Sequence, residues 1–204
     1  MTQPTLSVGV TPPIRRPRTR DVGSARSPRV ASGVALANVR SLASIELTVY
    51  DPRWPRLYEA EIARVTEALA PVVAAEHVGS TSVPGLAAKP TIDIAVGVVS
   101  LDLPEGARAG MERLGYDYGG DHGQPQHVFR KGTSVPWRFL VHVVQYGGPM
   151  WLDFLRFRDY LRANPDEAER YALLKASLLA DHGAWYSGRD KEPFIRPVLD
   201  SRRT

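Results

Sequence analysis

A nearly continuous run of apolar and β-branched residues over positions 91–99 is interrupted by one acid, Asp93. Such a run predicts a buried strand, so the chain is expected to fold around a central β-strand. A carboxylate that stands among Ile92, Ile94 and Val96 is costly to bury unless it is paired or bound to a cation. The sequence therefore predicts both the centre of the fold and a polar site at Asp93.

Shorter strands are predicted on both sides of this run. Alternation of apolar and polar residues indicates a half-buried strand over residues 45–49, and a short strand is predicted over 74–78. Aromatic and β-branched residues indicate two more, over 127–131 and 137–146. Because strands and helices mix without strict strand–helix–strand alternation, the pattern favours an α+β fold over a doubly wound sheet.

The helices are predicted from apolar side chains that recur on one face. The first helix ends before Pro71 and presents Tyr58, Ile62, Val65 and Leu69. Asp102 and Glu105 form a capping-box pattern for a second helix. The last quarter is predicted to be helical, with a restart at Asn164-Pro165 and apolar stripes at Phe154, Phe157 and Leu161, then at Tyr171, Leu174 and Leu178.

The basic character of the chain belongs to residues 1–44. The whole chain carries a net charge of +4, but these residues hold seven arginines against one acid, so the rest is net negative. Their five prolines and lack of aromatic residues predict a disordered tail. Three interpretations remain open: an inert tail, a start codon assigned too far upstream, or a basic arm that contacts nucleic acid.

Several classes of protein are excluded by composition. The chain has no cysteine, which excludes disulfides, thiolate catalysis and cysteine-ligated metals. No apolar run reaches the roughly 18–20 residues that span a bilayer, and the tail lacks the roughly 7–15-residue apolar core of a secretory signal. We therefore expect a cytoplasmic protein with no membrane partner. The sequence gives no indication of its oligomeric state.

The turn Gly79-Ser80 lies between the predicted strand 74–78 and the run 91–99. It is not a P-loop, because three residues separate Gly85 from Lys89. A glycine at a strand end lets the backbone approach a ligand, and the next serine offers its hydroxyl to phosphate oxygens. Mg²⁺ prefers oxygen ligands and often holds phosphates through one or two carboxylates. The turn and Asp93 together predict a phosphate and metal site.

This arrangement resembles the nucleotidyltransferase superfamily, whose signature is Gly-Ser followed by an Asp-x-Asp strand. More specifically, the chain looks like a member of the GrpB family over residues 47–200, with the tail outside. The similarity rests on residues 49–54, 76–90, 92–94 and 141–143 and on Tyr171, Lys175 and Lys191. It implies a mixed β-sheet of nucleotidyltransferase type with flanking helices and a helical C-terminal part, in a domain of residues 45–204. Similar domains occur fused to dephospho-coenzyme-A kinases, which suggests nucleotide metabolism.

The resemblance also implies roles for individual residues. Asp93 matches the first metal-binding acid, and His142 is what remains of a His-x-His pattern, so both are predicted as catalytic. The predicted phosphate-binding residues are Gly79, Ser80, Thr81, Lys89, Lys175 and Lys191. The chain departs from the pattern at two places: Ala95 stands where the second acid is expected, and Leu140 replaces the first histidine. A third acid is not identifiable.

Each of these residues also has a structural interpretation. Asp93 could be capped by backbone N–H groups or paired with Lys89 or Arg138, and Gly79-Ser80 could be only a tight turn. His77 and His142 stand on predicted strands, where a histidine is more often hydrogen-bonded in the core.

The two C-terminal lysines also have both a structural and a functional interpretation. Lys175 could extend its ammonium from the edge of an apolar stripe to solvent or reach inward to a phosphate, and Lys191 could be a surface charge.

Three functions follow from these observations. The first is an enzyme that transfers a nucleotidyl group, with Asp93 holding Mg²⁺ and lysines offsetting the phosphate charge. The second is a non-catalytic module that binds a nucleotide or another phosphorylated small molecule, which the missing acid at Ala95 favours. The third is a nucleic-acid partner that binds through residues 1–44.

Overall fold

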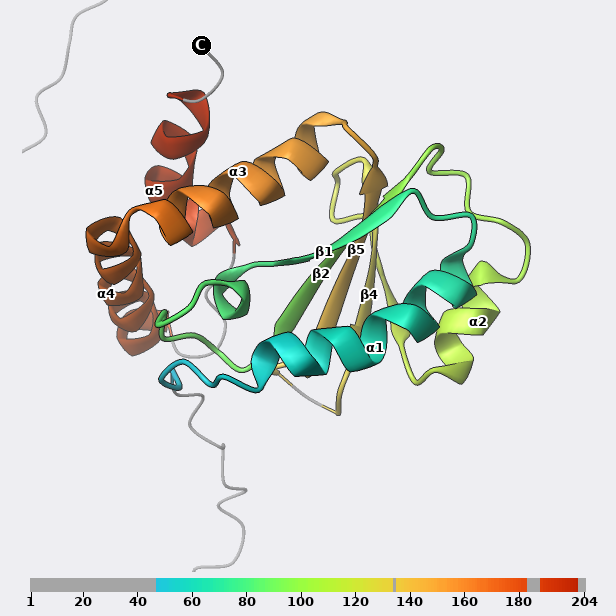
Figure 1. The fold of residues 1–204 in the computed structure, drawn as a ribbon, viewed down its shortest axis with the longest axis horizontal. Coiled ribbons are helices and arrows are strands. Elements are labelled where there is room, and N and C mark those ends of the chain that lie inside the picture. The colour runs from blue at the N-terminus through green and yellow to red at the C-terminus, as the bar shows by residue number, and fades with distance from the viewer. Residues whose placement is uncertain (1–46, 134, 183–187, 202–204) are drawn as a thin grey trace, which may run out of the picture. The chain divides into compact units, whose positions relative to one another are not determined.

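The computed structural model describes residues 47–133, 135–182 and 188–201, which form a mixed sheet with helices on both faces (Figure 1). The predicted tail, residues 1–44, lies outside the described residues. Among the described helices, none is long and apolar enough to cross a membrane. The α+β prediction is confirmed.

The sheet has the order β1-β2-β5-β4-β3. Strands β2 and β5 are parallel, and the other neighbours are antiparallel. The bounds are β1 Ala74–Val78, β2 Ile92–Val98, β3 Asp117–Gly120, β4 Gln126–Lys131 and β5 Phe139–Gln145. The predicted buried strand is therefore β2, and it lies between β1 and β5.

The helices divide between the two faces of this sheet. Figure 1 shows α1 (Trp54–Leu69) and α2 (Ala107–Arg113) on one face and α3 (Pro149–Ala163) on the other. The last two helices, α4 (Pro165–His182) and α5 (Gly188–Asp200), pack with α3 at one end of the molecule. The helical restart predicted at Asn164-Pro165 is confirmed by α4.

Alternation along β2 sends its side chains to environments of different polarity. Ile92, Ile94 and Val96 are buried in the large apolar core beneath α1 and α2. The intervening residues face α3, where Ala95 packs in a smaller apolar cluster with Val78, Val144 and Trp151. Asp93 belongs to this second set of alternating residues, so the sheet positions its carboxylate on the α3 side.

A third apolar cluster joins the long β1–β2 connection to the C-terminal helices. Val83 and Leu86 of the connection pack there with Leu161 of α3 and Tyr171 of α4. Phe157 joins this cluster, whereas Phe154, predicted in the same stripe, packs with the sheet cluster instead. The connection is thus held in place by helices that lie far along the chain.

The strand predicted over residues 45–49 is not formed as predicted. Residues 45 and 46 lie outside the described range, and Thr48 makes a single antiparallel bridge with Ala88. Val49, predicted to be an inward-facing residue, is 79% exposed. Apolar and polar residues alternate in this segment, but it forms no strand because only Ala88 of the β1–β2 connection pairs with it.

The predicted capping box of the second helix is also wrong. Asp102 hydrogen-bonds with Ser100, and α2 begins at Ala107 after Gly106, whose φ is +84°. No side chain caps this helix. The Asp102 side chain is therefore used in a local turn, which is a common alternative to capping for this residue type.

Candidate functional site

The Asp93 side chain is held against the backbone of Gly79. Strands β1 and β2 pair so that Val78 lies opposite Asp93. A Cβ added to Gly79 would lie only 2.2 Å from Asp93 Oδ2. Gly79 also has a φ of +68°, which disfavours a side chain. The sequence predicted that a glycine here lets a ligand approach. In the structure, the group that approaches Gly79 is the carboxylate of Asp93, which keeps 25% of its side chain exposed.

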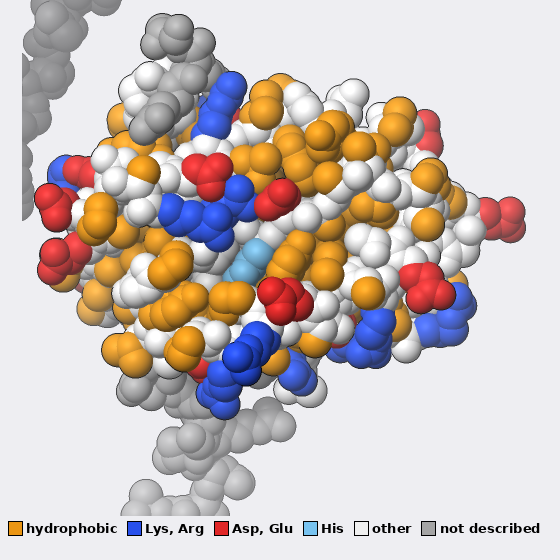
Figure 2. All heavy atoms as spheres, in the orientation of Figure 1, with side chains coloured by type: hydrophobic (Ala, Val, Ile, Leu, Met, Phe, Trp, Pro, Cys, Tyr) orange, Lys and Arg blue, Asp and Glu red, His pale blue; other side chains and the backbone are white. Residues whose placement is uncertain are grey.

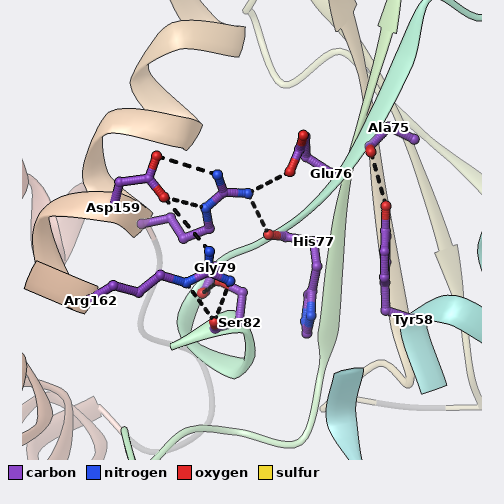
Figure 3. Close-up of polar contacts among 9 residues, drawn as sticks. Tyr58, Ala75, Glu76, His77, Gly79, Ser82, Asp159 and Arg162 are labelled. Carbon is purple, nitrogen blue, oxygen red and sulfur yellow. Dashed lines mark hydrogen bonds and ion pairs between the residues drawn. The ribbon is translucent and has the colours of Figure 1, made fainter. Parts of the chain in front are cut away.

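The turn after Gly79 forms one short 3-10 segment, η1 (Ser80–Ser82). The Ser82 hydroxyl donates to the Gly79 carbonyl oxygen at 2.6 Å, and Arg162 of α3 donates Nε and Nη2 to the Ser82 carbonyl oxygen at 3.1 and 2.8 Å (Figure 3). Ser80 is partly exposed, and its hydroxyl makes no hydrogen bond with any described residue. The turn is therefore rigidly held while the Ser80 hydroxyl is available to a ligand.

Thr81, which is predicted to bind phosphate, makes hydrogen bonds within the protein through its side chain. Its buried hydroxyl donates to the Thr91 carbonyl oxygen at 2.9 Å and lies 3.1 Å from His77 Nε2. Because its one proton goes to Thr91, the Thr81 oxygen accepts from His77, whose proton is therefore on Nε2. The side chain of Thr81 locks the turn to β1 and to the start of β2.

His77 is the core histidine that its structural interpretation described. Its ring stacks on Tyr58 with centroids 5.2 Å apart, and the two side chains lie next to each other in Figure 3. Burial lowers the pKa of His77 to about 4, and the Arg162 and Arg158 charges act in the same direction against Asp93. His77 is therefore neutral at physiological pH and serves to support the turn.

Two lysines from separate segments, Lys89 and Lys175, each lie within electrostatic range of Lys191, and we call the three residues the lysine cluster. Lys175 of α4 is 3% exposed, and its Nζ donates to the Ala87 carbonyl oxygen at 2.6 Å. Of its two predicted arrangements, the structure shows the inward one.

The lysine cluster is crowded with positive charge. Burial and, to a smaller extent, the Lys191 ammonium lower the pKa of Lys175 to about 7 against the opposing charge of Asp93. Burial and the Lys191 charge likewise lower the pKa of Lys89 to about 8. Lys191 itself is partly buried; burial lowers its pKa, and Asp93 and Asp190 oppose that shift. Lys191 therefore belongs with Asp93 and is not an isolated surface charge.

His142 lies beside Asp93 on the same face of the sheet. It pairs across β2–β5 with Ala95, and its Nε2 is 3.9 Å from Asp93 Oδ1. On the other side, His142 Nδ1 lies 3.1 Å from Oε1 of Gln126, and Phe154 packs against the ring. The structure thus brings two predicted catalytic residues together and adds a glutamine that sequence reasoning missed, because nothing local to Gln126 distinguishes it.

Arg138 and Lys89, the two side chains predicted as alternative partners of Asp93, make other contacts. Arg138 is exposed and stacks over the Phe139 ring at 5.5 Å. Lys89 contributes to the lysine cluster. Asp93 is therefore a partly exposed acid in a cationic environment.

The residues around Asp93 do not fit a two-metal centre. Ala95, which stands at the position of the expected second acid, is fully buried among apolar side chains. Among the residues that the structure describes, no three His, Asp or Glu side chains come together to hold a metal ion. Two cations held about 3.5–4 Å apart need more carboxylates than Asp93 alone.

Arg158 of α3 is a second residue that the sequence reasoning missed. It is buried and donates to Glu76 Oε2 at 2.7 Å, to the His77 carbonyl oxygen at 3.1 Å and to Asp159. It lies four residues after Phe154 and three before Leu161, so the apolar spacing of α3 could have identified it as an inward cation. It joins α3 to β1 next to the site.

The face shown in Figure 2 carries acidic and basic side chains as close neighbours. Strong single-strand nucleic-acid binders instead present a basic groove interleaved with aromatic residues. The third predicted function depends on residues 1–44, which lie outside the described part of the chain.

Comparison with known proteins gives consistent matches. A family model described as GrpB protein matches residues 44–201. A UPF0157 protein of Deinococcus radiodurans is 34% identical over 184 residues, which are 88% of this chain and 94% of the relative. The UPF0157 protein YqkA of Bacillus subtilis is 36% identical over 140 residues, or 68% of this chain, and the match spans 40% of YqkA.

One solved structure also matches. The crystal structure of the conserved protein GrpB from Enterococcus faecalis superposes with a TM-score of 0.68 at 34% identity. The superposition covers 76% of this chain and 96% of that chain.

Proposed function

Because the chain belongs to the GrpB family, we propose that it binds a nucleotide or another phosphorylated small molecule beside Asp93. The ligand phosphates would contact the lysine cluster and the Ser80 hydroxyl. The resemblance to nucleotidyltransferases suggests where the site lies. The charges of the site suggest that its ligand is an anion.

The observation that carries the proposal is that Lys191 lies within electrostatic range of Lys89, Lys175 and the Asp93 carboxylate. Buried ammonium groups are costly without compensating negative charge. Here Lys175 is almost fully buried, and Lys191 lowers the pKa of both other members. Asp93 and Asp190 supply negative charge near Lys191. A phosphate, with its negative charge and strong acceptor oxygens, would offset the repulsion that Lys191 exerts on the other two lysines.

The described residues favour binding over two-metal transfer. Ala95 is packed among Val78, Val144 and Trp151, so a carboxylate at this position would displace apolar contacts. The site can thus orient a phosphorylated ligand through Ser80 and the lysines, without the acids that two-metal chemistry requires.

Nucleotidyl transfer with Mg²⁺ is the second candidate, and one observation favours it. Asp93 and His142 lie together and are both partly exposed. If Mg²⁺ takes part, Asp93 is the carboxylate that would hold it, with ligand phosphates as its other ligands. Such an ion would stabilise the charge on a departing pyrophosphate.

The test is titration calorimetry of the full chain with pyrophosphate and ATP, each in EDTA and in Mg²⁺. Lys191→Met should weaken binding about tenfold or more, because it removes one charge-assisted contact. Arg170→Met is the matched control, since it removes an exposed cation of α4 that pairs with Glu167. The control should bind as the wild type does.

The outcomes separate the two candidate functions. Binding in EDTA without turnover supports the module, whereas release of pyrophosphate from ATP in Mg²⁺, lost in Asp93→Asn, supports transfer. Equal affinities for the wild type and Lys191→Met would contradict the proposed site.

A further inference from the structure

The His142 imidazole has one hydrogen-bonding arrangement, because Gln126 controls one of its nitrogens. Gln126 Nε2 donates to the Asp121 carbonyl oxygen at 3.2 Å, which leaves Gln126 Oε1 facing His142 Nδ1 at 3.1 Å. An amide oxygen only accepts hydrogen bonds, so Nδ1 carries the proton of the neutral ring. The lone pair is then on Nε2, which lies 3.9 Å from Asp93 Oδ1.

When the His142 ring is neutral, two acceptors therefore lie side by side, and neither can donate to the other. From this geometry we propose that the site binds a vicinal diol of the phosphorylated ligand. One hydroxyl would donate to His142 Nε2, and the neighbouring hydroxyl would donate to the Asp93 carboxylate. The two side chains are 16% and 25% exposed, so a ligand can reach both.

The surrounding charge favours hydroxyls over a cationic donor. Lys175 and Lys191 both lie within electrostatic range of Asp93. An ammonium group at the two acceptors would meet repulsion from these lysines, whereas a neutral hydroxyl would not. The ligand class is therefore a phosphorylated polyol or sugar. This inference rests on the proposed function, because the phosphate of the same ligand would contact the lysine cluster.

Gln126 acts in this proposal as a positioning residue. It contacts no ligand itself, but it sets which nitrogen of His142 accepts a hydrogen bond. Long-range ¹H–¹⁵N correlation spectra of the full chain report this directly. The expected spectrum shows the Nδ1–H tautomer of His142 in the wild type. An Nε2–H tautomer would overturn the inference without any variant being made.

The binding test compares glycerol 3-phosphate, which carries a vicinal diol, with propyl phosphate, which has the same chain without hydroxyls. We expect the wild type to bind glycerol 3-phosphate on the order of tenfold more tightly, as two net hydrogen bonds would give. His142→Phe and Asp93→Asn should each reduce this preference. The matched control Asp117→Asn changes an exposed acid of β3 and should retain it.

Each result of the binding test has one meaning. A preference that depends on His142 supports the diol site. Equal binding of the two phosphates overturns it while the anion site stands. If neither phosphate binds and pyrophosphate also fails, the proposed function and the inference are overturned together.

Discussion

Two groups of charged side chains in the described part of the chain, one around Glu61 and one around Asp93, differ in how their charges are paired. Glu61 of α1 is 5% exposed and accepts from Lys131 at 2.6 Å and from the Tyr116 hydroxyl at 3.1 Å. Arg64 lies 3.6 Å from its other oxygen. At the second group, the lysine cluster, Asp93 lies within electrostatic range of Lys175 and Lys191, and Lys191 lies within range of Lys89.

The comparison shows how a supporting contact differs from a ligand site. The Glu61 group closes on itself: its acid has donors on both oxygens, and burial together with Glu61 raises the pKa of Tyr116, which keeps that hydroxyl a donor. It joins α1 to β4, and both of its cations pair with the same carboxylate. In the lysine cluster, the Lys191 charge lowers the pKa of both Lys89 and Lys175, and a bound anion would offset that repulsion.

Gly79→Ala should break the second group most severely. A Cβ there collides with Asp93 Oδ2 and forces a side chain at a φ of +68°. We expect a loss of about 3–4 kcal/mol in the free energy of unfolding, with loss of phosphate binding. Gly85→Ala is the matched control, because Gly85 has a φ of +79° but no atom within 4 Å of the added Cβ. Equal losses in chemical denaturation would show that backbone strain alone matters.

Glu61→Leu should break the first group and leave the second intact. It removes the acceptor of Lys131 and Tyr116, and we expect a loss of about 2–3 kcal/mol in stability. Pyrophosphate affinity should not change, because Glu61 faces α2 and β4 on the other side of the sheet. Glu67→Leu, at an exposed position of the same helix, should cost much less. A weakened pyrophosphate affinity in Glu61→Leu would show that the two groups are coupled.

The pH dependence of stability tests the lysine cluster in the absence of ligand. The pKa of Lys175 is about 7 in the folded protein, below its ordinary value of 10.5. The unfolded chain therefore binds more protons between about pH 7 and 10.5, so ligand-free stability should rise with pH across this window. We expect Lys175 to contribute to this gain, so Lys175→Met should make stability rise less steeply with pH. Denaturation at pH 7 and pH 10 measures this gain, and an unchanged slope in the variant would refute it.

Much of the fold could be predicted from the sequence, because periodicity marks buried faces. The bounds of β1 match the predicted strand 74–78, and β2 lies one residue inside the predicted run. Strand β3 was missed because it contains Gly119 and Gly120 and is defined by its pairing with β4, which no local pattern indicates. The capping box failed because Asp102 bonds with Ser100.

The candidate site was less accessible to sequence reasoning. Gly79, Ser80 and Asp93 are close along the chain, so a local motif could identify them. The roles of Thr81 and Gln126 depend on partners from other strands. The Thr81 hydroxyl is occupied by His77 and Thr91, and such an assignment requires the tertiary arrangement.

The parallel pairing of β2 with β5 has a consequence for the order in which this protein folds. Asp93 and His142 sit on these neighbouring strands, but the chain forms α2, β3 and β4 between them. The polar pair is therefore a contact of high sequence separation, which a growing or partly folded chain cannot make early. Recognition of a ligand by these two residues would report that β2 and β5 have paired, and a fragment that stops before β5 would retain Asp93 without its partner.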